Sequence, residues 1–95
     1  MSNVTPLFDS PNTQSLIACG IPDYMHEGIL NYVENRVKPG HFLTAIITND
    51  LRNAVFHADS TNLNLIKNYV QWFYNHPPSP CWGSVEKMEA WLAGE

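Results

Sequence analysis

Residues 39–58 decide the fold, and they read PGHFLTAIITNDLRNAVFHA. Apolar residues recur in this stretch at the three- and four-residue steps of one helix face. The proline and glycine at its start mark where a helix begins, and the periodicity continues to its end. We therefore expect one long helix here. Its expected buried stripe consists of Leu43, Ile46, Ile47, Leu51, Ala54, Val55 and Ala58.

Asp50 is the most informative polar residue of this stretch. At 100° per residue its side chain points into the apolar stripe, where a carboxylate without partners would be very costly. Asp50 must therefore meet hydrogen-bond donors. Two alternatives stay open. The carboxylate caps the free N–H groups of a neighbouring helix or loop, or it lines a partly buried pocket and accepts hydrogen bonds from a ligand.

The segment before this stretch predicts an arm and a second helix. Apolar residues recur at helical steps between residues 22 and 33, and Pro22 suits the first turn of a helix. Residues 1–19 carry no sustained periodicity, although Pro11 favours the start of a short helix that Gly20 stops. We expect an N-terminal arm at 1–19, with that short helix, followed by a helical domain over residues 20–95.

The segment after it predicts two more helices. Apolar residues at three- and four-residue steps run from residue 63 to residue 73, and Asp59 or one of the two residues after it supplies a cap. Pro77 ends this helix, and Ser84 caps a last one. Because no strand signal of any length occurs, we expect an all-α fold, a compact bundle of four to five short helices.

Composition excludes several classes of function. The 95 residues carry five basic and nine acidic side chains, for a formal net charge of −4, and the basic residues form no run. Duplex nucleic acid is therefore not an expected partner, because proteins that neutralise phosphates carry a basic face. No apolar run reaches membrane-spanning length and no signal-peptide pattern is present, so we expect a cytoplasmic protein without a membrane partner.

The sequence patterns of catalytic, metal and cofactor sites do not occur. The four histidines do not lie at metal-ligand spacing from one another or from the two cysteines. A glycine-rich phosphate loop and a nucleophile motif are also missing from the sequence. We therefore expect a protein that binds rather than catalyses, with no catalytic residue, no metal and no cofactor.

Polar groups and aromatic rings indicate how such binding would work. Asn49 and Asp50 can exchange hydrogen bonds with a base or ribose edge, and Arg52 or a helix N-terminus can meet phosphate. Aromatic rings can stack on a flat ligand or anchor a partner protein. The rings that we expect to contribute are Tyr24, Phe42, Tyr74 and Trp82.

Residues from Gly20 to Trp91 form a specific pattern. It consists of Gly20-Ile21-Pro22, Met25, Gly28, Tyr32, Pro39-Gly40, Phe42-Leu43, Asn49-Asp50-Leu51, Ala58-Asp59, Asn62, Trp72, Tyr74-Asn75 and Trp82-Gly83-Ser84. With this pattern the chain resembles a family of small, mostly hypothetical proteins encoded by bacteriophages and prophages. The resemblance names no activity. It implies a binding role, since small phage proteins without catalytic motifs often act on host defence or host enzymes in that way.

Two functions fit this resemblance. The first is a sponge that sequesters a nucleotide-derived immune signal, usually in pockets shared between subunits, and so counteracts host defence. The second is an interaction module that inhibits a host protein, and its sign would be an exposed patch that includes Trp72 or Trp82. Both act in the cytoplasm of the bacterial host. We expect a homo-oligomer, because so small a domain does not cover all its aromatic residues.

Overall fold

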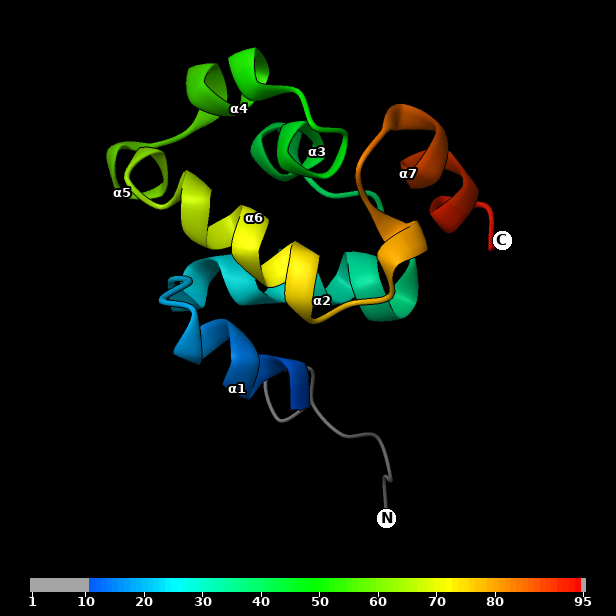
Figure 1. The fold of residues 1–95 in the computed structure, drawn as a ribbon, viewed down its shortest axis with the longest axis horizontal. Coiled ribbons are helices and arrows are strands. Elements are labelled where there is room, and N and C mark those ends of the chain that lie inside the picture. Colours follow the sequence, from blue (N-terminus) through cyan, green and yellow to red (C-terminus); the bar gives the residue numbers. More distant parts are fainter. Residues whose placement is uncertain (1–10, 95) are drawn as a thin grey trace.

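The structure, a computed structural model, describes residues 11–94 and is all α-helical, as the sequence predicts (Figure 1). These residues form seven α-helices and no strand. The helices are α1 (Pro11–Ala18), α2 (Asp23–Asn35), α3 (His41–Ile47), α4 (Leu51–His57), α5 (Ser60–Leu63), α6 (Ile66–Asn75) and α7 (Val85–Leu92), with a 3₁₀ turn at Ser79–Cys81 before the last.

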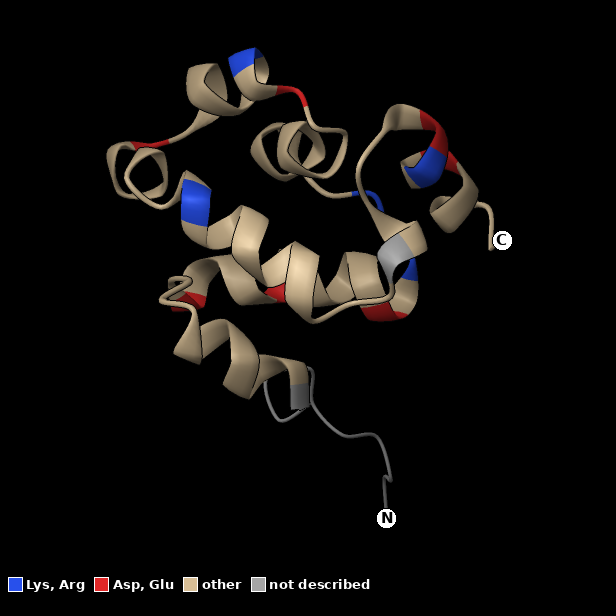
Figure 2. Ribbon diagram, in the orientation of Figure 1, with Lys and Arg blue, Asp and Glu red and all other residues tan. Residues whose placement is uncertain are grey.

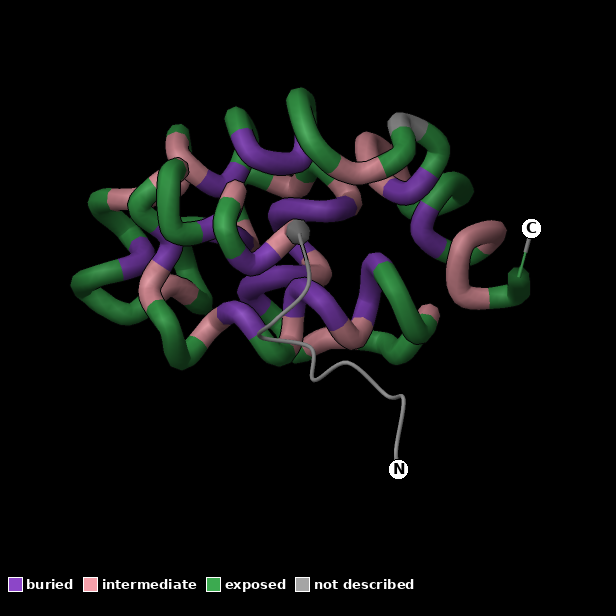
Figure 3. Tube along the Cα trace, turned by 90° about the horizontal axis from the view of Figure 1, so that it is seen from below, coloured by how far each residue is buried: buried purple, intermediate pink, exposed green. Residues whose placement is uncertain are grey.

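The helices surround one core. Helix α3 lies between α4 and α6, α1 lies against α2, and the 3₁₀ turn packs on α7 (Figure 1). The radius of gyration is 12.8 Å, close to the value of about 13 Å for a compact domain of 100 residues. Buried segments run along the interior and most outer turns are exposed (Figure 3). Helix α4 is at one margin of this arrangement.

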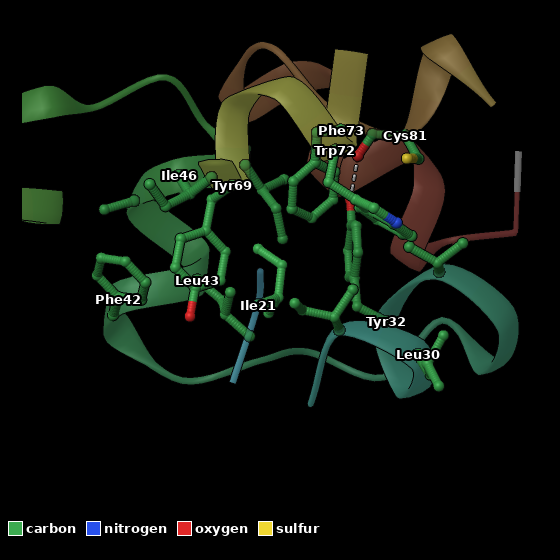
Figure 4. Packing of buried hydrophobic residues seen from close by; sticks show 14 of the residues in the cluster. Ile21, Leu30, Tyr32, Phe42, Leu43, Ile46, Tyr69, Trp72, Phe73 and Cys81 are labelled. Atoms are coloured by element: carbon green, nitrogen blue, oxygen red, sulfur yellow. Dashed lines mark hydrogen bonds between the residues drawn. The ribbon is translucent and has the colours of Figure 1, made fainter. Parts of the chain in front are cut away.

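Large aromatic side chains fill the core, and their polar atoms have partners (Figure 4). The Tyr32 hydroxyl donates to the Cys81 carbonyl at 2.5 Å. The Trp72 indole N–H donates to Ser15 Oγ at 2.7 Å. Phe73 is fully buried, and Trp72 is only 1% exposed. Because Ser15 of α1 satisfies its N–H, the indole can be buried without an orphaned donor.

The expected single helix over residues 39–58 is two helices. Asn49 adopts the left-handed conformation (φ 64°), which Asn tolerates better than most residues, and this ends α3. Asp50 then serves as the N-cap of α4. The break turns α4 relative to α3, so the apolar stripe does not continue across it. Leu51 and Val55, expected in the core, are therefore exposed.

The next expected helix is also divided. Asp59 caps the short helix α5, as predicted, by accepting from the Asn62 amide at 2.7 Å. The Asn62 side chain is buried and accepts from the Tyr69 hydroxyl at 2.5 Å, which fixes α5 against α6. Helix α6 begins only at Ile66. These two breaks explain why the helices are shorter and more numerous than the four to five expected.

The last helix is anchored to α2. Ser84 caps α7, as predicted, by accepting from the Lys87 amide. Arg36, left-handed at φ 58°, donates to the Trp91 carbonyl at 2.8 Å and lies 3.9 Å over the Trp91 ring. The Trp91 indole N–H in turn donates to the Tyr32 carbonyl at 3.0 Å. This closes the α2–α7 end of the molecule.

The segment expected as an arm is only partly described. Its first ten residues lie outside the described part of the chain. Helix α1 follows, and its residue Leu16 is fully buried. The carbonyl of Cys19 accepts from the Asn68 side-chain amide of α6 at 2.8 Å. Residues 11–19 thus belong to the packed domain. None of the helices in residues 11–94 is long and apolar enough to span a membrane.

Candidate functional site

Helix α4 is a ridge on the surface. Of its seven residues only Ala54 is buried, where it meets α3. Phe56 is 79% exposed, Leu51 is 68% exposed, and Val55 is also exposed. Packing within the described residues therefore does not explain why α4 carries large apolar side chains.

An apolar groove follows the side of α4 that faces α6. It is shallow, with a volume of about 40 Å³. Leu51 and Ala54 form one wall, and Ile66 and Val70 of α6 form the other. Val70, expected in the core, is 40% exposed along this groove. The full lining is Ala45, Ile46, Asn49, Asp50, Leu51, Ala54, Ile66 and Val70.

A second concavity, which we call the polar hollow, involves both α3 and α4. It is larger, about 170 Å³. Its lining includes two imidazole rings, two hydroxyls, a carboxylate and an amide. The lining residues are His41, Thr44, Ala45, Thr48, Asp50, Asn53 and His57.

Asp50 borders both concavities but is not enclosed in either. Its side chain is half-buried, and its two oxygens accept from the Asn53 backbone amide at 3.2 Å and the Asn53 side-chain amide at 2.7 Å. These hydrogen bonds, the side-chain one foremost, hold the pKa of Asp50 below its usual value. The expectation that this carboxylate points into an apolar stripe is wrong, because the helix breaks at Asn49. The capping alternative describes what the side chain does.

Each of the two helices that line the apolar groove carries one cation. Arg52 is exposed on α4 and Lys67 is exposed on α6 (Figure 2). Neither makes a hydrogen bond or an ion pair with another residue of 11–94. The nearby carboxylates, by contrast, are engaged. Asp50 bonds to Asn53, and Asp59 accepts from the Tyr24 hydroxyl at 2.7 Å as well as capping α5. Because their hydrogen-bond donors are neutral, both carboxylates stay ionised, and the charge of Arg52 helps to lower the pKa of Asp50.

The residues predicted to bind a nucleotide come together only in part. Asn49 and Asp50 line the apolar groove, and Arg52 follows in the first turn of α4. Tyr24 is exposed on α2 and bonds to Asp59, and Tyr74 is exposed near the end of α6.

The other two predicted rings serve packing. Phe42 is buried, and its ring meets Tyr69 edge-on at 5.1 Å. Trp82 is half-buried with its ring 5.8 Å from that of Phe73. Phe42 is therefore not available for stacking on a ligand at the surface, because the core covers its ring.

Sequence reasoning missed three residues of this region. Phe56 was not singled out, and His41 and His57 were treated as unrelated. The break at Asn49 folds α3 and α4 into a hairpin, which brings the first residue of α3 beside the last residue of α4. The two imidazoles stack with centroids 5.1 Å apart and an angle of 22° between their planes. A hairpin recognised at Asn49-Asp50 would have predicted this pair.

Comparison with known proteins assigns no relative to this chain: no protein-family model, curated protein or solved structure matches it. Within residues 11–94, no group of three or more His, Cys, Asp or Glu side chains is placed to hold a metal ion. The site is therefore interpreted from its own geometry. Its features are the exposed apolar residues of α4, a shallow apolar groove between α4 and α6, and a polar hollow.

Proposed function

We propose that the protein is an interaction module that docks on another protein through the α4 face. By this name we mean Leu51, Val55 and Phe56 of α4 together with Val70 of α6 and the apolar groove. The carrying observation is the exposure of Phe56 and Leu51, 79% and 68%, on a helix whose only buried residue is Ala54. The patch expected to include Trp72 or Trp82 does not contain Trp72, whose ring is buried, and Trp82 is half-buried beside Phe73. We therefore propose the α4 face in its place.

The shape of the face favours a helix as its occupant. Exposed apolar patches mark protein contact sites. Leu51 and Val70 line the groove, and Val55 and Phe56 extend the exposed apolar surface of α4 beyond it. The groove has two helical walls, and an amphipathic helix laid along such a groove inserts side chains three and four residues apart. Small-molecule pockets typically enclose about 300–1,000 Å³, so a 40 Å³ groove suits side-chain anchors better than a whole ligand.

The charge around the face favours a partner with acidic residues beside its apolar surface. Arg52 and Lys67 are exposed on the two helices of the groove, and neither makes a hydrogen bond or an ion pair with another residue of 11–94. Carboxylates on an incoming helix would be attracted to them, which speeds association and fixes its register.

The resemblance to phage-encoded proteins indicates where that partner would be found. Small phage proteins of this kind act on host components, so the partner is a protein of the bacterial cytoplasm. Docking on it would block its surface without any chemistry by this chain. The absence of catalytic sequence motifs agrees with this role.

A capture experiment with matched variants tests the proposal. The full chain, immobilised, is incubated with lysate of a bacterial host. Phe56→Glu places a charge in the α4 face, and Val85→Glu places the same charge at a half-exposed valine of α7, away from it. We expect a stoichiometric protein with the wild type and with Val85→Glu, and its loss with Phe56→Glu.

Three results would contradict it. Equal capture by both variants would show that binding uses another surface. No specific capture from any host lysate would remove the support for a foreign partner. Light scattering that gave a dimer mass for the wild type and a monomer mass for Phe56→Glu would assign the face to a second copy, and with it the homo-oligomer predicted from sequence.

Charge reversal at the two cations tests the acidic nature of the partner. Arg52→Glu combined with Lys67→Glu leaves the apolar residues intact. We expect slower association with the captured partner and a weaker dependence on salt, because screened attraction governs the encounter. Unchanged kinetics would mean that the partner carries no acidic residues at this groove.

Sequestration of a nucleotide-derived signal stays a second prediction, and the polar hollow is the feature that would serve it. At about 170 Å³ the hollow is smaller than typical ligand pockets, so the hypothesis requires a pocket completed by another subunit. Thermal unfolding with cyclic dinucleotides and ADP-ribose derivatives tests it. Ligand at 100 times its dissociation constant adds about 2.7 kcal/mol to stability. A melting temperature that no compound raises would count against this role.

A further inference from the structure

The polar hollow contains two imidazoles whose ring nitrogens have no hydrogen-bond partner in residues 11–94. His41 begins α3 and His57 ends α4, and the hairpin between these helices brings the rings together. Both are exposed, and neither ring nitrogen makes a hydrogen bond with another residue of 11–94. The Phe56 ring meets His57 edge-on at 5.2 Å, which restricts where that imidazole can turn. The proposed docking function does not use this pair.

Most hydrogen-bond donors around the two imidazoles are already used, whereas several acceptors remain free. Thr44 Oγ1 donates to the Pro39 carbonyl at 3.3 Å, and Thr48 Oγ1 donates to the Thr44 carbonyl at 2.8 Å. The Asn53 side-chain amide donates to Asp50. What remains are hydroxyl and carboxylate lone pairs and the ring nitrogens. Such a lining suits a cation rather than an anion.

We infer that the His41–His57 pair binds a divalent transition-metal cation of the Ni²⁺ and Zn²⁺ class. Imidazole nitrogen is a preferred ligand of these ions and lies about 2.0–2.1 Å from the bound metal. Ring centroids 5.1 Å apart leave room for one ion between the nitrogen edges after a small rotation of each ring. Asp50 is the one carboxylate that lines the hollow.

This site differs from a closed structural metal centre. No third His, Cys, Asp or Glu in residues 11–94 is placed to complete such a centre. The ion would therefore be held by two imidazoles, with water in its other positions. An open site of this kind binds and releases its metal readily, and it does not hold the fold together.

A nickel titration of the full, tag-free chain tests the inference. After chelator treatment, NiCl₂ is titrated at pH 7.5 and heat is measured by calorimetry. We expect one ion per chain for the wild type. His41→Asn and His57→Asn should each weaken binding at least about tenfold, because each removes one of two ligands. His76→Asn is the matched control, since that histidine is exposed on a different surface, beside Trp72. It should bind like the wild type.

Two further measurements separate ligation from damage to the fold. Circular dichroism and melting temperature without metal should be the same for all three variants, since the replaced rings are exposed. Paramagnetic Ni²⁺ should broaden the ring resonances of His41 and His57 before those of His26 and His76.

Several results would overturn the inference. The wild type giving no heat at pH 7.5 would do so directly. Equal affinity in His41→Asn, His57→Asn and the wild type would place the metal elsewhere, as would a loss confined to His76→Asn. Broadening that appeared first at His26 or His76 would have the same meaning. None of these outcomes bears on capture through Phe56, so the two proposals fail independently.

Discussion

The two ends of the molecule treat their large side chains in opposite ways. At the α2–α7 end, Tyr32 and Trp72 are buried and each has its polar atom bonded, to Cys81 and Ser15 respectively. At the α4 end, Phe56 and Leu51 face solvent although no polar atom prevents their burial. The chain thus buries two aromatic residues whose polar atoms need partners, and it leaves two purely apolar residues of α4 exposed.

The difference separates what holds the fold from what is free for binding. Burial of an aromatic ring with its hydrogen bond satisfied stabilises the folded chain. An exposed Phe contributes little to the stability of the fold. Its removal from water can instead stabilise a complex with a partner. We therefore expect substitutions at the α2–α7 end to change stability, and substitutions on the α4 face to change binding.

Trp72→Ala gives the largest expected effect. The indole fills the core between α1 and α6, and its N–H bonds to Ser15. Truncation leaves a cavity and should lower the free energy of unfolding by about 3–5 kcal/mol. Urea titration followed by circular dichroism measures it. A loss below about 1 kcal/mol would contradict the burial of Trp72 in the core.

Tyr32→Phe sharpens the comparison by removing one oxygen. The hydroxyl donates to the Cys81 carbonyl at 2.5 Å inside the core, and burial raises the Tyr32 pKa. Without it, the carbonyl stays buried and unsatisfied, which should cost about 1–3 kcal/mol. The exposed Tyr74→Phe is the control, and its unfolding free energy should not change measurably. Equal effects of the two substitutions would contradict the burial assigned to Tyr32.

The sequence predicted the closed end better than the α4 end, for a physical reason. Helical periodicity locates α2, and the cap Ser84 is recognisable because its side chain bonds to an amide three residues on. The break at Asn49 has the same kind of signal, since Asp50 bonds to the Asn53 amide, but the apolar periodicity on both sides of it favours one continuous helix. Asn accepts both right- and left-handed conformations, and which one it adopts depends on tertiary packing.

That one residue accounts for most of what sequence reasoning missed. Reading through Asn49 places Leu51 and Val55 on the buried face and turns Asp50 inward. With the break, both apolar residues are exposed and Asp50 becomes a cap. Residues 49–51, in the region proposed from the sequence, do line a concave surface. The prediction that Asp50 points into an apolar stripe depended on one continuous helix, and the chain forms two.

Acid should remove a smaller contribution made by Asp59 near the α4 end. The Tyr24 hydrogen bond, and then the Asn62 amide, hold the pKa of this carboxyl below its usual value. The folded state therefore favours the ionised form. Its contribution is present above the unfolded pKa of about 3.9 and is lost as pH falls through the lower folded pKa.

Asp59→Asn measures this contribution. At pH 7 the variant should melt below the wild type, and the gap should narrow as the pH falls below the unfolded pKa of about 3.9 and Asp59 becomes protonated. Asp23→Asn is the control, since that carboxylate bonds to no other residue of 11–94, and its gap should be smaller. A gap for Asp59→Asn that stayed constant from pH 7 to pH 2 would contradict the assignment.

Phe56→Ala should have the smallest effect on stability. The ring is 79% exposed and touches mainly its neighbour His57, so its loss should change the free energy of unfolding by no more than about 0.5 kcal/mol. Urea titration beside Trp72→Ala gives the contrast directly. A cost above about 2 kcal/mol would place Phe56 in the core and erase the distinction between the two ends.

The account depends most on the α4 face being the surface that meets a partner, and one measurement addresses it directly. Amide resonances of the ¹⁵N-labelled chain are compared with and without the purified partner captured by the wild type. We predict that Leu51, Val55, Phe56 and Val70 shift or broaden while Val85 on α7 does not. Perturbations confined to α2 and α7, with the α4 resonances unmoved, would contradict the account.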